Sequence, residues 1–159
     1  MLMQRHRLSK REAGFILIEF MTVVAILGIL AQIALPNFIT YRNNNRVAAG
    51  VGTGEDIRTA LAAFAAHSTD NLFPATGSIT SDSDLSGIVN RHGGALKATA
   101  AAMGIALISY SAIDGNEDGM PNTYALMLSI TGVPSTFQGH FIRVTPEGIT
   151  RCPDPAGAC

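Results

Sequence analysis

The sequence predicts an α+β protein in which one long N-terminal helix packs on a small antiparallel β-sheet. Three observations predict this class: a 21-residue apolar run at 15–35, a helical spacing of apolar residues that continues to about residue 67, and four short strand-like runs after residue 103. With the apolar run set aside, roughly a hundred residues remain, which is enough for one small globular domain.

Residues 1–14 form a short basic segment. It holds the basic residues Arg5, Arg7, Lys10 and Arg11 and a single acidic residue, Glu12. The rest of the chain has seven basic and eleven acidic residues, so no nucleic-acid partner is indicated. Basic residues that flank an apolar helix stay on the cytoplasmic side of a membrane, so this segment is expected in the cytoplasm and the remainder outside it.

The run from Phe15 to Leu35 is long enough to cross a bilayer. As a helix it would measure about 31 Å, against about 30 Å for the hydrocarbon core. A secretory signal peptide is an alternative, but the run exceeds the usual apolar core of such peptides and no small-residue cleavage site follows it. A plain signal anchor is a second alternative.

Glu19 is the only charged residue in this apolar run. A carboxylate inside an apolar helix costs several kcal/mol unless it is paired or neutralised, so Glu19 requires a partner. The alternative is a side chain that extends to the nearby membrane interface. Gly28 and Pro36 weaken helical structure, and Pro36 predicts a kink.

The helix is expected to continue past Pro36 as an amphipathic segment ending near His67. Ile57, Leu61 and Phe64 recur at helical spacing and define its apolar face. Three glycines interrupt it within five residues, at positions 50, 52 and 54. Glycine is a poor helix former, so a break there competes with the prediction of one helix over 15–67.

The junction between the basic segment and the apolar run has a specific pattern. Gly14 is followed by Phe15-Ile16-Leu17-Ile18-Glu19, which places a carboxylate on the fifth residue after the glycine, and the run continues as VVAILGILAQIALPNF. This pattern resembles the N-terminal motif of type IV pilins and of the pseudopilins of type II secretion. Ile16 and Phe20 depart from the commonest residues at their positions, and neither affects the glycine or the glutamate.

The resemblance implies a processing route and a set of partners. A prepilin peptidase would cut after Gly14, removing residues 1–14, and would methylate the new amino terminus at Phe15. That ammonium group would offset Glu19 of a neighbouring subunit as helices pack into a filament. The resemblance also implies helix loss between Gly28 and Pro36 on assembly, an inner-membrane assembly platform as partner, and a pilin-like fold.

Residues 68–159 are expected to form the globular head. The serine- and aspartate-rich stretch 68–86 is predicted to be a surface connection, and 94–103 to contain a short helix. Strands are predicted at 104–113, 123–131, 140–145 and 148–152, with a tight turn at Pro146-Glu147-Gly148.

A loop in the head resembles half of a calcium-binding loop. Asp114, Asn116 and Asp118 alternate and precede Gly119, which is a pattern of oxygen ligands that Ca²⁺ can use. The closing glutamate is absent, since Ala125 stands at the twelfth position. No cofactor is required, and Ca²⁺ is the one candidate. The alternative is a hairpin loop whose polar residues serve only turn geometry.

The two cysteines lie at the end of the chain. Cys152 and Cys159 match neither a zinc nor a redox spacing, so a disulfide is predicted in an exported domain, with free thiols as the alternative. A bridge over so short a loop is worth about 2 to 3 kcal/mol. The four histidines are scattered, and the chain has neither a phosphate loop nor a G-x-S-x-G motif, so no enzymatic activity is expected.

Three functions compatible with this motif stay open. The first, favoured by Phe38, Tyr41 and the C-terminal cysteines, is a subunit of a type IV pilus, made in the inner membrane and assembled into an extracellular homo-oligomeric filament. The second, favoured by the calcium-like loop, is a pseudopilin in a periplasmic pseudopilus. The third is a minor pilin acting as an adhesive or priming module, for which no surface motif argues.

Overall fold

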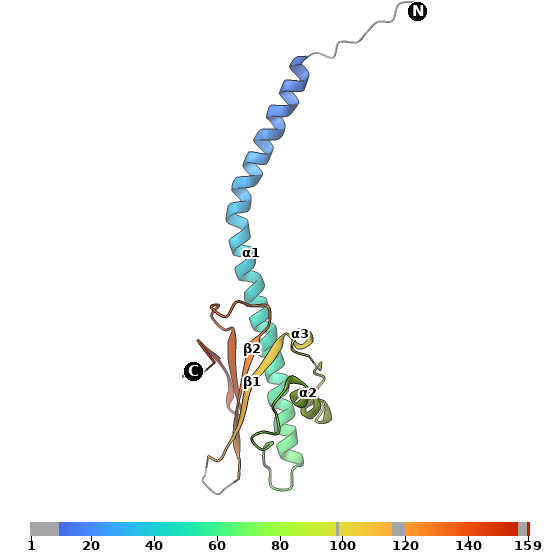
Figure 1. The fold of residues 1–159 in the computed structure, drawn as a ribbon, viewed down its shortest axis with the longest axis vertical. Helices are drawn as coiled ribbons and strands as arrows, with labels where there is room; N and C mark the ends of the chain where they lie inside the picture. Colours follow the sequence, from blue (N-terminus) through green and yellow to red (C-terminus); the bar gives the residue numbers. More distant parts are fainter. Residues whose placement is uncertain (1–9, 98, 116–119, 156–158) are drawn as a thin grey trace, which may run out of the picture. The chain divides into compact units, whose positions relative to one another are not determined.

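The computed structural model describes residues 10–97, 99–115, 120–155 and 159. Its elements in chain order are α1 Lys10–His67, α2 Asp82–Arg91, α3 Ala100–Met103, β1 Ile105–Ile113, β2 Thr123–Ile130, β3 Phe141–Thr145 and β4 Gly148–Cys152 (Figure 1). The chain divides into two compact units, Met1–Arg42 and Asn43–Cys159, and each is described by itself. The α+β class predicted from the sequence is confirmed.

Helix α1 runs without interruption from Lys10 to His67. It begins five residues before the expected start at Phe15, because residues 10–13 are Lys, Arg, Glu and Ala, all of them strong helix formers next to an apolar helix. The sequence interpretation named Gly28 and Pro36 as helix breaks, and in this structure neither breaks the helix. Proline lacks a backbone N–H, so the helix loses one hydrogen-bond donor at Pro36. A long helix tolerates this loss when its turns continue on both sides.

The four strands form one antiparallel sheet in the order β1-β2-β3-β4. Residues pair in simple hairpin register, with Ile105 opposite Ile130 and Thr145 opposite Gly148 at the expected tight turn. Each observed strand lies within one residue of its predicted range at both ends. An irregularity between Leu107 and Ser109 in β1 leaves Ile108 unpaired in the register of the β1–β2 pair.

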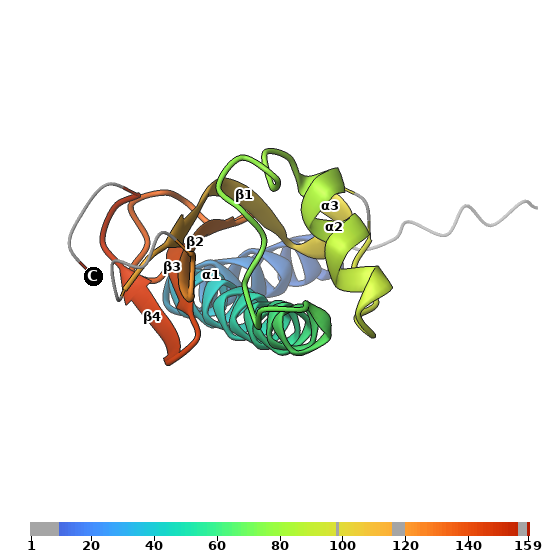
Figure 2. The same ribbon diagram turned by 90° about the horizontal axis from the view of Figure 1, so that it is seen from below.

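The core of the second unit lies between this sheet and residues 43–67 of α1. Figure 2 shows the strands on one side of the helix, with α2 and α3 next to β1. The predicted apolar face is confirmed, since Ile57 and Leu61 are fully buried and Phe64 packs against the core. Strand β2 buries all of its inward residues, and Met127 on its other face is buried as well; the inward residues are Tyr124, Leu126, Leu128 and Ile130.

Two of the three clustered glycines explain how α1 approaches the sheet. A Cβ atom on Gly50 would lie 2.9 Å from both Cγ1 and Cδ1 of Ile130, and one on Gly54 would lie 2.8 Å from Cδ1 of Ile149. Gly50 and Gly54 are one turn apart and therefore share a face. The break considered at these glycines does not occur, because the close contact with the sheet favours helix here despite the low propensity of glycine.

Helix α2 corrects the prediction that residues 68–86 are entirely a surface connection. Ser81 and Asp84 form a reciprocal capping box, and Leu85, Ile88 and Val89 are buried at helical spacing. Serine and aspartate are common both in loops and at helix N-termini, so the stretch was mistaken for loop. The short helix predicted within 94–103 is present as α3, which occupies only Ala100–Met103.

Candidate assembly surface

The first unit presents a continuous apolar surface. Every residue from Ile16 to Arg42 is exposed in this chain. The large apolar side chains of this stretch are between 47% and 69% exposed, the extremes being Ile39 and Phe20. Burial of apolar surface is worth roughly 25 cal/mol per Å². An apolar surface of this extent is therefore expected to be buried against a membrane or another protein.

Length and composition allow this stretch to cross a membrane. Within the part of the chain that the structure describes, one helix qualifies, with a mean hydropathy of 2.4 over its most apolar window and none of that window buried. A buried core helix of a soluble domain would pass the same test of length, but its side chains would be covered by the rest of the domain. The exposed side chains separate this helix from that case.

Glu19 lies near the N-terminal end of this apolar surface. Its side chain is exposed, and among the described residues its carboxylate has no hydrogen-bond or ion-pair partner. Its backbone carbonyl accepts a hydrogen bond of 2.8 Å from Thr22 Oγ1. The partner that the sequence requires for Glu19 must therefore come from outside the described chain.

Other polar side chains of this surface bond to their own helix. Asn37 Nδ2 donates to the Ile33 carbonyl at 3.2 Å, and Thr40 Oγ1 donates to the Pro36 carbonyl at 3.1 Å. Such bonds reduce the cost of placing polar groups in an apolar environment. The Glu19 carboxylate, a pure acceptor when ionised, receives no such bond from the described residues.

The remaining N-terminal site residues all lie in α1. The backbone of Gly14 and Phe15 is helical, and the structure does not test cleavage or methylation there. A Cβ atom on Gly28 would meet nothing within 4 Å, so no contact inside this chain accounts for the glycine. Helix loss between Gly28 and Pro36 on assembly stays a prediction.

The structure describes the calcium-like loop only in part. Asn116 and Asp118 lie outside the described residues, so this site stays a prediction. Asp114 lines a hollow with Thr76 and Pro121, and the Gly115 N–H donates to Asn122 Oδ1 at 2.9 Å, which closes the base of the loop. Within the described ranges, no group of three or more His, Cys, Asp or Glu side chains could hold a metal ion.

The C-terminal cysteines are joined in a disulfide. Cys152 and Cys159 are bonded with Cα atoms 4.7 Å apart, and Cys152 is buried at the end of β4. The predicted pairing is present. The bridge ties Cys159 to the end of β4.

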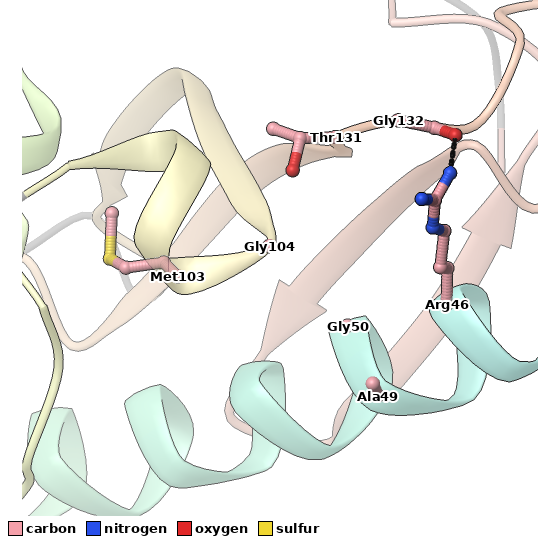
Figure 3. A pocket seen from close by; sticks show the side chains of 7 residues that line it. All are labelled: Arg46, Ala49, Gly50, Met103, Gly104, Thr131 and Gly132. Carbon is pink, nitrogen blue, oxygen red and sulfur yellow. Dashed lines mark hydrogen bonds between the residues drawn. The ribbon is translucent and has the colours of Figure 1, made fainter.

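A cavity of about 420 Å³ lies between α1 and the ends of β1 and β2. Arg46 extends from α1 and donates a hydrogen bond to the Gly132 carbonyl (Figure 3). Gly132 has a φ of 73°, and a Cβ atom there would lie 2.9 Å from Arg46 Nη1. This contact fixes the loop after β2 on α1, and the other lining residues are Ala49, Gly50, Met103, Gly104 and Thr131.

One pair of residues was missed by reasoning from sequence. His67 ends α1 and His92 follows α2, and their ring centroids lie 6.0 Å apart. The residues are separated by 25 positions and match no spacing motif, so only the folding of α2 next to α1 brings them together.

Several known proteins resemble this chain over part of its length. The type IV major pilin protein PilA of Myxococcus xanthus is 52% identical over 44 residues, which are 28% of this chain and 20% of that protein. The type IV major fimbrial protein FimA of Dichelobacter nodosus is 36% identical over 84 residues, which are 46% of this chain and 52% of that protein.

A secretion protein is also similar. The type II secretion system core protein G of Pseudomonas aeruginosa is 37% identical over 68 residues, which are 42% of this chain and 46% of that protein. Two further observations agree with these similarities. They are the sequence motif that runs from Gly14 to Glu19 and the fold, in which one long helix packs on a four-stranded sheet. Together these findings support the type IV pilin and pseudopilin superfamily for this chain.

The matches to these relatives are partial. The chain spans between 20% and 52% of the length of these three relatives. No family model and no solved structure matches it significantly. The relatives thus include two pilus or fimbrial proteins and one protein of a secretion system.

Proposed function

We propose that this chain is a structural subunit of a type IV pilus, assembled through the exposed apolar surface of α1, and not an enzyme. The observation that carries the proposal is that surface itself, in which apolar residues from Ile16 to Tyr41 surround one unpartnered carboxylate at Glu19. A membrane can cover it first, and copies of the same helix can cover it later. Helix packing of this kind produces a homo-oligomeric filament.

Glu19 gives the assembly its register. Cleavage after Gly14 creates an ammonium group at Phe15, four residues before Glu19 on the same helix. An opposite charge on a neighbouring subunit offsets the desolvation of the carboxylate, and this requires one axial offset between the two helices. A register shift would leave both charges unpaired in an apolar environment.

The route follows from these features. The chain is inserted in the inner membrane with residues 1–14 in the cytoplasm, a prepilin peptidase removes them and methylates Phe15, and an inner-membrane platform adds the subunit to an extracellular filament. The match to two major pilus or fimbrial proteins supports the pilus role.

A second candidate is a pseudopilin of a type II secretion system. The similarity to core protein G favours it, as does the calcium-like loop that begins at Asp114. In that case the filament would be a periplasmic pseudopilus. Both candidates use α1 in the same way. They differ in the location of the filament, which is outside the cell for a pilus and in the periplasm for a pseudopilus.

The first prediction concerns the carboxylate. Glu19→Gln and Glu19→Ala should each abolish or sharply reduce filaments, because neither side chain carries the charge that a neighbouring amino terminus would pair with. The measurement is electron microscopy and immunoblotting of material sheared from cells, with the membrane-bound pool as reference. Asp56→Asn is the matched control, since it removes an exposed carboxylate from the same helix outside the apolar surface.

Mass spectrometry accompanies this experiment, because a variant that escapes cleavage would also fail to assemble. Both wild type and variants should begin at methylated Phe15. Normal filaments from Glu19→Ala would contradict the role of the carboxylate. Sheared wild-type material without this chain, together with a secretion defect on its deletion, would support the pseudopilin instead.

A further inference from the structure

His67, which is exposed, and His92, which is partly buried, form a pair of imidazoles at the ends of α1 and α2. Their ring centroids are 6.0 Å apart and their planes are inclined by 49°, so the rings are neither stacked nor in an edge contact. With metal–nitrogen bonds of about 2.0 to 2.1 Å, two imidazoles on one ion have ring centres about 5 to 6 Å apart. The observed separation is at the upper end of this range, before any rotation of either side chain.

His67 is held in a form that leaves one nitrogen free. Its Nδ1 lies 2.7 Å from the Ala63 carbonyl oxygen, and because a carbonyl only accepts, Nδ1 carries the proton. The same bond places the lone pair on Nε2, for which the described residues supply no partner. Metal-binding histidines are commonly oriented by such a bond from the other ring nitrogen to a backbone carbonyl.

His92 is positioned by the end of α2. The N–H groups of His92 and Gly94 both donate to the Val89 carbonyl, at 3.1 and 2.9 Å. A Cβ atom on Gly94 would lie 2.2 Å from Val89 Cγ1, so this tight turn requires glycine. The edge of Phe64, from α1, contacts the His92 ring with centroids 5.0 Å apart, which holds the ring next to α1.

One acidic residue lies near His92. Asp56 lines a hollow of about 310 Å³ together with His92 but without His67, so its carboxylate contributes negative charge on one side of the His92 ring. The nearest basic residue in sequence, Arg91, donates its Nε–H to the Gly87 carbonyl one turn earlier in α2. His67 is exposed to solvent, so water can reach an ion held between the two rings and complete its coordination.

We propose that His67 and His92 bind one divalent transition-metal ion, with water in the remaining positions. Imidazole nitrogens suit Zn²⁺, Ni²⁺ and Cu²⁺, and the general order of stability places Cu²⁺ tightest. The ion would connect the C-terminal end of α1 to the turn after α2. It is separate from the calcium-like loop at Asp114, which offers oxygen ligands.

The test uses the full chain extracted in detergent and titrated with Zn²⁺ alone by calorimetry, then with Cu²⁺. One ion should bind per chain, Cu²⁺ tighter than Zn²⁺. His67→Gln and His92→Gln should each weaken binding on the order of tenfold or more, since removal of an outer partner of a ligand already costs 10- to 100-fold. His140→Gln is the matched control, because it removes an imidazole that is in ring contact with Phe141 and not with the pair.

A second measurement needs no variant. Sub-stoichiometric Cu²⁺ should broaden the ring proton signals of His67 and His92 in wild-type protein before those of His140. Circular dichroism and a thermal melt without metal establish that each variant is folded. The proposal would be overturned if a variant that carries both His67→Gln and His92→Gln bound Zn²⁺ as tightly as wild type. Broadening that begins at His140 would also overturn it.

Discussion

At the scale of single residues, the glycines of α1 perform different tasks although they stand close together. Gly50 and Gly54 contact the sheet, where a Cβ atom would meet Ile130 or Ile149 at under 3 Å. Gly52 lies on the opposite, exposed side, and a Cβ atom there would meet nothing within 4 Å. The cost of glycine in a helix is offset by packing at the first two positions and not at the third.

Substitution by alanine should therefore change the free energy of unfolding in opposite directions at Gly52 and Gly50. Gly52→Ala should raise the free energy of unfolding of the second unit, Asn43–Cys159, by about 0.5 to 1 kcal/mol. The reason is that alanine favours helix and has open space there. Gly50→Ala should lower it, since Ile130 is fully buried and two of its carbons would have to move. Denaturant unfolding of the detergent-extracted chain measures both, and the same sign at both positions would contradict this packing.

At the scale of elements, α2 depends on its capping box. Thr80 and Ser81 donate hydrogen bonds to Asp84 Oδ2, and the Asp84 N–H donates to Ser81 Oγ. These bonds, first that from the Ser81 side chain, lower the pKa of Asp84 below its usual value. An acid with a depressed pKa in the folded state contributes stability above its unfolded pKa and loses it as the pH falls through the folded value.

Acidification should consequently loosen the start of α2. Amide hydrogen exchange in α2 should become faster, relative to the β2 strand, as the pH falls below about 3.8, the ordinary value for aspartate. Asp84→Asn should remove this difference between pH values, whereas Ser81→Ala should weaken α2 at every pH, by about 1 kcal/mol at neutral pH. An unchanged acid response in Asp84→Asn would refute the assignment to this carboxyl group.

At the scale of the whole head, two buried tyrosines connect its stability to alkaline pH. Tyr110 donates a hydrogen bond of 2.6 Å to the Pro74 carbonyl, while the Tyr124 hydroxyl has no hydrogen-bond partner among the described residues. Burial raises the pKa of Tyr124 to about 12 and that of Tyr110 above its usual range. Phe73 meets the Tyr124 ring edge-on, with centroids 4.8 Å apart.

The head should lose stability as the pH rises from about 10 towards 12, because the unfolded chain releases phenolic protons that the native state retains. Denaturant midpoints across this range measure the loss. Tyr124→Phe should reduce the pH dependence at little or no cost at neutral pH, since it removes a hydroxyl without a protein partner. Tyr110→Phe should cost about 1 kcal/mol at neutral pH, so a larger loss in Tyr124→Phe would contradict this arrangement.

Local patterns in the chain were sufficient for most of this architecture. The apolar run with Glu19, the strand ranges, the turn at residues 146–148 and the pairing of Cys152 with Cys159 depend on composition and short spacing, which are visible in the chain itself. The motif at Gly14 also indicated the superfamily. Local patterns misjudged α2, because serine and aspartate suit both a loop and a helix N-terminus until Leu85, Ile88 and Val89 find a core to enter.

Contacts between distant segments account for the rest. Gly50 and Gly54 looked like helix breakers, and only the approach of the sheet made them the residues that α1 needs. His67 and His92 looked unrelated, and only the docking of α2 beside α1 placed their rings together. The reason is the same in both cases: close packing depends on which surfaces meet in space, and the spacing of residues along one segment does not contain that information.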